Sequence, residues 1–174
     1  YVEMAPGNWV FKVVDKVVKA TDASWAFFAE GTAGSTGAYV AGPATAPLGT
    51  GSAELSVSAA SQAHAFGKAM LAGTKLTALT DLAYSSSQPA GSVAVSLQFT
   101  ISYAGASGYQ GRLVFEPTYT VGTVPSGWQR WDTLQGKWWA SDTSAAGSNG
   151  LCPQAAPCEW SQVLTNWPEG QVEY

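Results

Sequence analysis

Hydrophobic and polar residues alternate along several short stretches of this chain, which is the pattern of strands that bury one face. The clearest stretch covers residues 92–103. Its alternate apolar positions are Val93, Val95, Leu97, Phe99 and Ile101. A glycine-containing turn follows, and residues 110–119 return with Leu113 and Phe115 on one parity. The opposite parity of this second stretch carries Arg112, Val114 and Glu116. The two stretches predict an antiparallel hairpin with one face in the core.

Three further stretches also predict strands. Residues 9–18 alternate tryptophan, phenylalanine and valine with lysine, which suits a strand at a solvent face or a sheet edge. Residues 24–30 form a short aromatic strand, and residues 54–58 alternate with Leu55 and Val57 directed inward. Strands of this kind, spaced along the whole chain, are typical of an antiparallel sandwich.

One loop and one helix complete the pattern. Residues 42–51 are rich in glycine and proline and predict a long loop. Near the end of the chain, apolar residues fall at positions i, i+3, i+4 and i+7, namely Trp160, Val163, Leu164 and Trp167. This period predicts a helix over 158–167, which begins after Pro157 and stops at Pro168. Its two tryptophans are expected in a core stripe rather than at a ligand.

The expected fold class is therefore all-β: an antiparallel β-sandwich with one short C-terminal helix. At 174 residues the chain is long enough for one domain with a sizeable core, so we expect a single domain over residues 1–174. Within it, residues 1–20 would provide an N-terminal strand, either at a sheet edge or exchanged with another molecule.

Composition narrows the class of partner. Charged residues make up 11% of the chain and the formal net charge is −4, with the basic residues scattered. Nucleic-acid binding, which needs a concentrated positive surface, is therefore not expected. No stretch approaches the roughly 20 apolar residues of a membrane-spanning helix. The chain also begins without a signal sequence. These observations favour a mature secreted or cell-surface protein whose signal has been removed.

The cysteines point to the same compartment. Cys152 and Cys158 are the two cysteines of the chain, and two thiolates without a second pair of ligands do not make an ordinary structural zinc site. A disulfide that closes a small loop is the better interpretation, with free thiols as the alternative in a reducing compartment.

Several longer motifs resemble a widespread group of exported bacterial proteins. They are Gly42-Pro43, Pro47 to Ser52, Gly73 to Ser85, Tyr109 to Pro117, Trp128 to Leu134 and Trp138-Trp139. The resemblance implies a jelly-roll sandwich related in architecture to lamin-G-like and concanavalin-like lectin folds, in an extracellular compartment, without an established activity. In that group further strands follow the helix, whereas this chain stops at Tyr174. Either the strand over 9–18 or a strand from another molecule is expected to take their place.

Tryptophan dominates the candidate functional residues. The chain has eight tryptophans, and large amphipathic rings are enriched at binding surfaces, although most tryptophans of a domain lie in its core. The expected ligand-binding residues are Trp128, Trp131, Trp138, Trp139, Arg112, Glu116 and Asp132. If residues 137–140 form a strand, Trp138 and Trp139 point to opposite sides, so one of them faces outward. The alternatives are packing of these tryptophans in the core and an Arg112–Glu116 ion pair that covers a sheet.

Catalytic and metal-binding motifs are not evident in the sequence. His64 is the single histidine, so neither a zinc site nor a Ser-His-Asp triad is expected. The carboxylate pair that a glycosidase needs could come only from Glu116 and Asp132. Calcium held by loop carbonyls with Asp81 or Asp132 is a weak alternative to the absence of any cofactor.

The leading hypothesis is a non-catalytic extracellular module that binds carbohydrate or another cell-surface polymer through exposed tryptophans. The alternative is a self-assembling structural subunit of an extracellular filament or surface layer, held by strand addition between copies. A third hypothesis is a polysaccharide hydrolase or lyase that uses Glu116.

Overall fold

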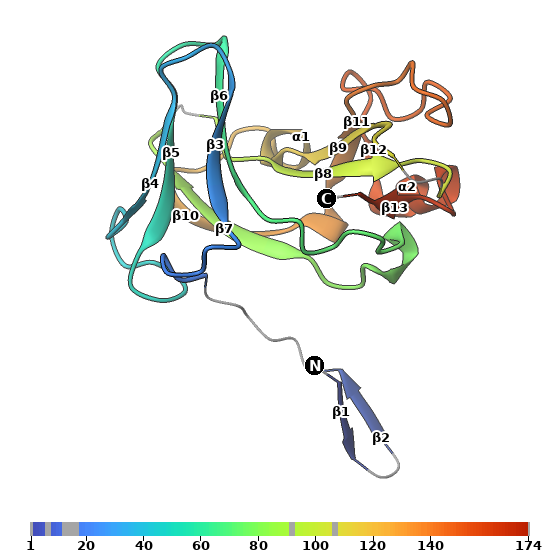
Figure 1. The fold of residues 1–174 in the computed structure, drawn as a ribbon, viewed down its shortest axis with the longest axis horizontal. Coiled ribbons are helices and arrows are strands. Elements are labelled where there is room, and N and C mark those ends of the chain that lie inside the picture. Colours follow the sequence, from blue (N-terminus) through green and yellow to red (C-terminus); the bar gives the residue numbers. More distant parts are fainter. Residues whose placement is uncertain (1, 6–7, 12–17, 91–92, 106–107, 174) are drawn as a thin grey trace. The chain divides into compact units, whose positions relative to one another are not determined.

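The computed structural model describes residues 2–5, 8–11, 18–90, 93–105 and 108–173, and these fall into two compact units. The first unit covers residues 1–67 and the second covers residues 68–174. In both units the strands pair antiparallel, and the longer of two small α-helices lies near the C-terminus (Figure 1). The expected all-β antiparallel fold with one short C-terminal helix is confirmed.

The N-terminal residues form a hairpin. β1 (Val2–Ala5) pairs antiparallel with β2 (Asn8–Phe11). The strand expected over residues 9–18 is therefore present at residues 9–11, and residues 12–17 lie outside the described part of the chain.

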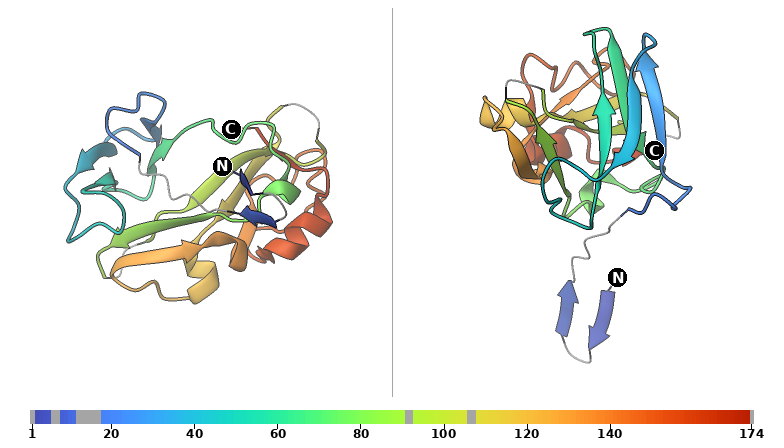
Figure 2. Two further views of the ribbon diagram at one scale, coloured as in Figure 1. Left: turned by 90° about the horizontal axis from the view of Figure 1, so that it is seen from below. Right: turned by 90° about the vertical axis from the view of Figure 1, so that its left-hand side faces the viewer.

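The rest of the first unit consists of two strand pairs. β3 (Ala26–Gly31) pairs with β6 (Gln62–Gly67), and β4 (Thr36–Val40) pairs with β5 (Ser52–Ser56). The four strands run side by side in the right-hand view of Figure 2. Aromatic rings fill the space between the pairs: Phe27 and Phe66 of the first pair meet Tyr39 of the second edge-on, at centroid distances of 5.1 and 5.6 Å.

Three expectations concern this unit. The aromatic strand over residues 24–30 corresponds to β3, and residues 42–51 form no strand or helix, as expected for a loop. The inward position of Val57 is wrong. β5 ends at Ser56, so Val57 has no place in the sheet and its side chain is 54% exposed.

The second unit contains two layers of strands. One layer is a five-stranded sheet in the order β12 (Cys158–Glu159), β11 (Lys137–Ala140), β9 (Gly111–Phe115), β8 (Leu97–Ser102) and β13 (Gln171–Val172). The other is the pair of β7 (Ala83–Gln88) and β10 (Gly127–Asp132), whose strands run together along their length in the left-hand view of Figure 2. The short helices of this unit are η1 (Leu76–Ala78), α1 (Pro117–Val121), η2 (Thr133–Gln135) and α2 (Trp160–Asn166), of which α1 and η2 connect strands of the two layers.

The core of the second unit lies between these layers. The β8–β9 hairpin is confirmed, and its apolar parity contributes Phe99, Ile101, Leu113 and Phe115 to the buried cluster. Tyr84 of β7 meets Phe115 edge-on at 6.2 Å, which joins the strand pair to the sheet. The helical stripe is also confirmed: the buried residues of α2 and its C-cap are Trp160, Val163 and Trp167. Burying each such side chain stabilises the fold by about 1.5–3 kcal/mol or more.

The start of β8 corrects one expectation. The strand predicted from residue 92 begins at Leu97, and Val93 and Val95 are 81% and 43% exposed rather than in the core. The reason lies in the neighbouring strand, because β9 ends at Phe115 and Pro117 starts helix α1. Residues that precede Leu97 therefore have no partner on the β9 side, although their own alternation is that of a strand.

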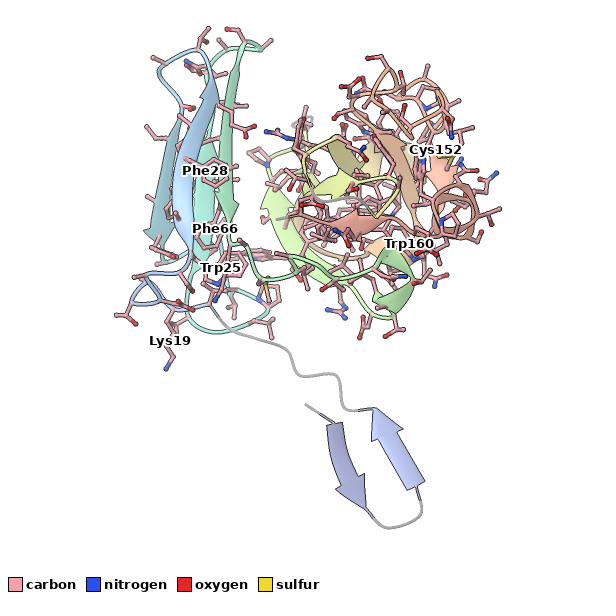
Figure 3. All side chains as sticks on the ribbon, turned by 45° about the vertical axis from the view of Figure 1, so that its right-hand side comes forward. Lys19, Trp25, Phe28, Phe66, Cys152 and Trp160 are labelled. Atoms are coloured by element: carbon pink, nitrogen blue, oxygen red, sulfur yellow. A yellow bond between two sulfur atoms is a disulfide. The ribbon has the colours of Figure 1, made fainter. Side chains whose placement is uncertain are left out.

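The two cysteines form a disulfide, with Sγ atoms 2.10 Å apart, as the sequence predicted. Both ends of the closed loop attach to β11. The carbonyl of Cys152 accepts a 2.8 Å hydrogen bond from the Ala140 amide, and Cys158 pairs with Trp138 in the sheet. Cys152 and Trp160 lie in the same part of the second unit (Figure 3). The loop thereby supplies the short edge strand β12.

Among the residues that the structure describes, none of the helices has the length and apolar character needed to cross a bilayer.

Candidate functional site

The outer face of the five-stranded sheet brings together three of the predicted ligand-binding residues. Trp139 of β11 pairs with Val114 of β9, two residues before Glu116. Alternation along a strand places Val114 and Glu116 on the same side, so the indole ring lies beside the carboxylate. Trp139 Nε1 donates a 3.1 Å hydrogen bond to Glu116 Oε1. Trp139 is half-buried, so an indole of fixed orientation occupies this face.

Arg112 lies on the same face, two residues before Val114. Its Nη1 donates a 3.3 Å hydrogen bond to Oε1 of Gln98 on the neighbouring strand β8. Its backbone amide donates to Ser141 Oγ at 2.9 Å, which fixes this end of β9. The face therefore presents a guanidinium, an amide, a carboxylate and an indole around the buried Val114, which is 1% exposed.

The apolar Val114 is the one member of this parity that the sequence pattern misassigns. Because it lies between Arg112 and Glu116, the alternation predicts an exposed side chain. The side chain of Val114 is instead among the most buried of those that the structure describes. The side chains around Val114 therefore shield it from solvent, and this part of the face is not uniformly exposed.

Trp128 and Asp132 lie elsewhere, on β10. Along this strand Trp128, Arg130 and Asp132 point to one side. Trp131 points to the other side, into the core. The outer face of the β7–β10 pair thus carries Trp128 and Asp132, on the opposite side of the core from Trp139 and Glu116. The seven predicted residues consequently do not form one site.

Trp131 and Trp138 are core residues, which corrects their expected role as stacking platforms. They are 7% and 0% exposed. Each indole N–H has a partner inside the fold: Trp131 Nε1 donates to Ser86 Oγ at 2.9 Å, and Trp138 Nε1 donates to the Thr133 carbonyl at 2.8 Å. The expectation that Trp138 and Trp139 point to opposite sides is confirmed, with Trp138 as the inward residue.

Tyr84 lies on the core side of the sheet, and the pKa of its hydroxyl is shifted. Burial, followed by the negative charge of Glu116, raises the pKa of the Tyr84 hydroxyl above its ordinary value. The phenol therefore stays protonated and donates a hydrogen bond to the Val95 carbonyl.

The aromatic cluster of the first unit was not anticipated as a feature of its own. Trp25 stacks on Phe66 with ring centroids 4.9 Å apart, and the rings of Phe66 and Phe27 are 4.7 Å apart. Trp25 and Phe66 are labelled in Figure 3. His64 lies at its side, and its Nδ1 is 3.1 Å from Ser35 Oγ. The shared parity of Phe27 on β3 and of His64 and Phe66 on β6 is the signal that could have indicated it.

Two polar atoms in this cluster are buried without a hydrogen-bond partner among the described residues, Trp25 Nε1 and His64 Nε2. His64 therefore belongs to the interior of a strand pair. Its neighbours are aromatic rings and a serine hydroxyl rather than further histidine or cysteine ligands.

The described residues contain no group of three or more histidine, cysteine, aspartate or glutamate side chains arranged to hold a metal ion. Asp81 and Asp132, the two residues considered for calcium, are both exposed.

Comparison of the chain with protein-family models, with curated proteins and with solved structures finds no significant match. The resemblance to exported jelly-roll domains stays a prediction from sequence motifs, and the functional argument depends on the geometry of the site.

Proposed function

We propose that this protein is a non-catalytic extracellular module that binds carbohydrate or a related cell-surface polymer at the outer face of its five-stranded sheet. The observation that carries this proposal is the contact between Trp139 and Glu116. The carboxylate holds the indole N–H at 3.1 Å and so fixes the plane of a half-buried ring.

A fixed ring lowers the entropic cost of binding, because the side chain need not be ordered when the ligand arrives. An aromatic ring offers an apolar surface on which a sugar ring can stack, and neighbouring polar groups can then bind its hydroxyls. Arg112 and Gln98 supply such groups on the same face, joined to one another by a hydrogen bond of 3.3 Å.

The arrangement of carboxylates supports binding rather than hydrolysis. Glu116 and Asp132, the pair suggested by the sequence, lie on different layers of the second unit. A hydrolase needs two carboxylates that flank one bond at about 5–10 Å from each other. Glu159, which also belongs to the five-stranded sheet, caps helix α2 with its side chain.

A glycan array followed by calorimetry tests the proposal. Trp139→Ala should weaken binding of the identified glycan about thirtyfold or more, since truncation of a central tryptophan typically costs about 2 kcal/mol or more. Trp128→Ala is the matched control, because it removes a half-buried tryptophan from the other layer. Equal affinity of Trp139→Ala and the unmodified protein, with the fold intact by circular dichroism, would contradict the proposal.

Strand addition between copies is the second candidate function, and a different observation favours it. The strand at one edge of the five-stranded sheet, β13, is short and pairs with two residues of β8, Ile101 and Ser102. If the N-terminal strand is the donor, deletion of residues 1–18 should abolish assemblies seen by electron microscopy. Assemblies that persist after the deletion would exclude this donor.

A further inference from the structure

The disulfide of the second unit is attached to both neighbours of Trp139. The Ala140 amide donates a 2.8 Å hydrogen bond to the Cys152 carbonyl, and Trp138 pairs with Cys158 across β11 and β12. On its other side, β11 pairs with β9. The strand segment that carries the tryptophan is therefore held from one side by β9 and from the other side by the two half-cystines.

The disulfide lies on the core side of the sheet, whereas the indole of Trp139 lies on the outer side. Trp138 is fully buried, and residues opposite one another in an antiparallel pair point to the same side, so Cys158 is directed toward the core. Cys152 is 3% exposed and belongs to the buried cluster of this unit. Alternation directs Trp139 to the opposite side. The disulfide is therefore not part of the outer face, and its influence on that face passes through β11.

The backbone of Cys152 adopts a conformation that is uncommon for a residue other than glycine. Its φ angle of 49° lies in the left-handed region, which persists at such residues where the surrounding structure imposes it. Two contacts of the sulfur hold the residue in place: the bond to Cys158 and a hydrogen bond of 3.3 Å from Asn166 Nδ2. In this conformation the Cys152 carbonyl is directed at the Ala140 amide. Loss of the disulfide removes the covalent one of these two constraints and releases the carbonyl.

The Cys158 end of the loop has an additional anchor. Helix α2 begins at Trp160, two residues later, and its ring lies 5.2 Å from the ring of Trp138 in the core. This contact does not depend on the disulfide. Removal of the disulfide should therefore release mainly the Cys152 end, which is bonded to the last residue of β11.

We propose that the Cys152–Cys158 disulfide is a positioning element of the carbohydrate site, which fixes the backbone around Trp139 and so keeps its indole directed at Glu116. This inference rests on the proposed carbohydrate function. The backbone angles of a residue restrict the orientations of its side chain, and the 3.1 Å hydrogen bond from the indole to Glu116 forms only within a narrow range of them. The module therefore binds its polymer more tightly with the disulfide intact than with the disulfide reduced.

Reduction converts this constraint into two separate thiols. A thiolate of a dithiol reagent attacks the half-buried Cys158 sulfur, and the S–S bond breaks with its electron pair on the Cys152 sulfur, which takes up a proton. The second thiol of the reagent then displaces the Cys158 sulfur from the mixed disulfide. The protein gains two thiols and the reagent becomes a disulfide. Cys158 is the sulfur that is attacked, because Cys152 is 3% exposed.

Nitrogen-15 relaxation of the tryptophan indole N–H groups tests the positioning without a ligand. Replacing Cys152 and Cys158 together by alanine should lower the order parameter of the Trp139 indole from the level of a rigid backbone, about 0.85, toward that of a flexible segment, about 0.6 or less. The Trp131 indole, which donates to Ser86 in the other layer, should keep its order parameter. Trp139→Phe assigns the signal. Reduction of the unmodified protein with dithiothreitol should give the same result as the double variant.

Calorimetry tests the consequence for binding, with the oligosaccharide that gives the strongest signal on the glycan array as the probe. The double variant should bind it about two- to tenfold more weakly, because a side chain that is free to move must be ordered on binding. Trp131→Phe is the matched control, since it should lower the stability of the same unit without changing the affinity. Circular dichroism checks that both variants fold.

Three results would overturn the inference. They are an unchanged order parameter of the Trp139 indole in the double variant, an equal fall at Trp131, which would show a general loosening of the unit, and equal glycan affinity of the double variant and Trp131→Phe. If the unmodified protein binds no glycan on the array, the proposed function fails instead. In that case the relaxation result alone decides whether the disulfide positions Trp139.

Discussion

Trp131 and Ser86 are joined across the β7–β10 pair by a hydrogen bond of 2.9 Å from the indole Nε1 to the serine hydroxyl, and both residues are buried. The serine hydroxyl in turn donates to Gln88 Oε1 at 3.4 Å, and the Gln88 amide donates to the Pro125 carbonyl. Trp131, which the sequence suggested as a ligand-binding residue, therefore donates the first hydrogen bond of a buried series.

Trp131→Phe should lower the free energy of unfolding without changing glycan affinity. The variant keeps an aromatic ring but removes the N–H donor, which leaves Ser86 with one partner fewer; we expect a loss of about 1–3 kcal/mol. Urea denaturation measures it. Trp139→Phe is the control, since its ring is half-buried and its partner Glu116 can bind water. A larger loss of stability for Trp139→Phe than for Trp131→Phe would contradict the assignment.

Removal of the disulfide should destabilise the second unit. Replacing Cys152 and Cys158 together by alanine should lower the free energy of unfolding by about 2 kcal/mol, because the unfolded chain regains the freedom of a short loop. The same shift should follow reduction of the unmodified protein, and the double variant should not respond to reductant. Asn166 Nδ2, which lies 3.3 Å from Cys152 Sγ, would lose this contact, so amide exchange should rise first in α2.

Gly37→Ala should disrupt the aromatic cluster of the first unit. A Cβ at Gly37 would lie 2.6 Å from His64 Nε2 and also overlap the ring of Phe27, so the rings would have to move. Gly67→Ala is the matched control, because its Cβ would lie 3.6 Å from Phe28, an ordinary contact distance. We expect Gly37→Ala to cost about 1–3 kcal/mol, and near-ultraviolet circular dichroism should report the change in ring packing. Equal stability of the two variants would be inconsistent with this packing.

Stability should decline in alkaline solution. Burial, then the charges of Asp142 and Tyr109, raises the pKa of Tyr103 from 10.0 to about 12. The unfolded chain releases the phenolic proton first, so the stability associated with Tyr103 is fully present below pH 10.0 and is lost as the pH rises through about 12. Tyr103→Phe should lessen this decline, measured as the free energy of unfolding against pH. An unchanged slope would show that other groups cause it.

The strands with a regular period were predictable from the sequence. The parity of residues 110–119 placed Leu113 and Phe115 in the core, and the helical period placed Trp160 and Trp167 there. Local alternation failed at Val93 and Val95 because pairing depends on the neighbouring strand, and Pro117 ends that strand too early to cover them. The hydrophobic periodicity of a segment reports on that segment alone, whereas the burial of its side chains depends on the neighbouring strands.

The candidate site was only partly predictable for the same reason. The sequence indicated which residues share a strand face, so Arg112 and Glu116 were rightly grouped. It did not indicate which strands lie side by side. The structure places Trp139 beside Arg112 and Glu116, and it places Trp128 and Asp132 on another layer. Trp131 could not be distinguished from a surface tryptophan without knowledge of its partner Ser86.

The bridge between Lys75 and Gln171 has a kinetic consequence. The Val172 amide donates a hydrogen bond to the Thr74 carbonyl, and the Glu173 amide donates one to the Thr100 carbonyl. The last strand therefore lies between two segments that are distant from it in the sequence. Such pairing requires closure of a long loop before any contact forms, and proteins rich in distant contacts fold slowly. Refolding of the second unit should therefore be much slower than that of a helical bundle of its size, with β13 among the last strands to gain protection from hydrogen exchange.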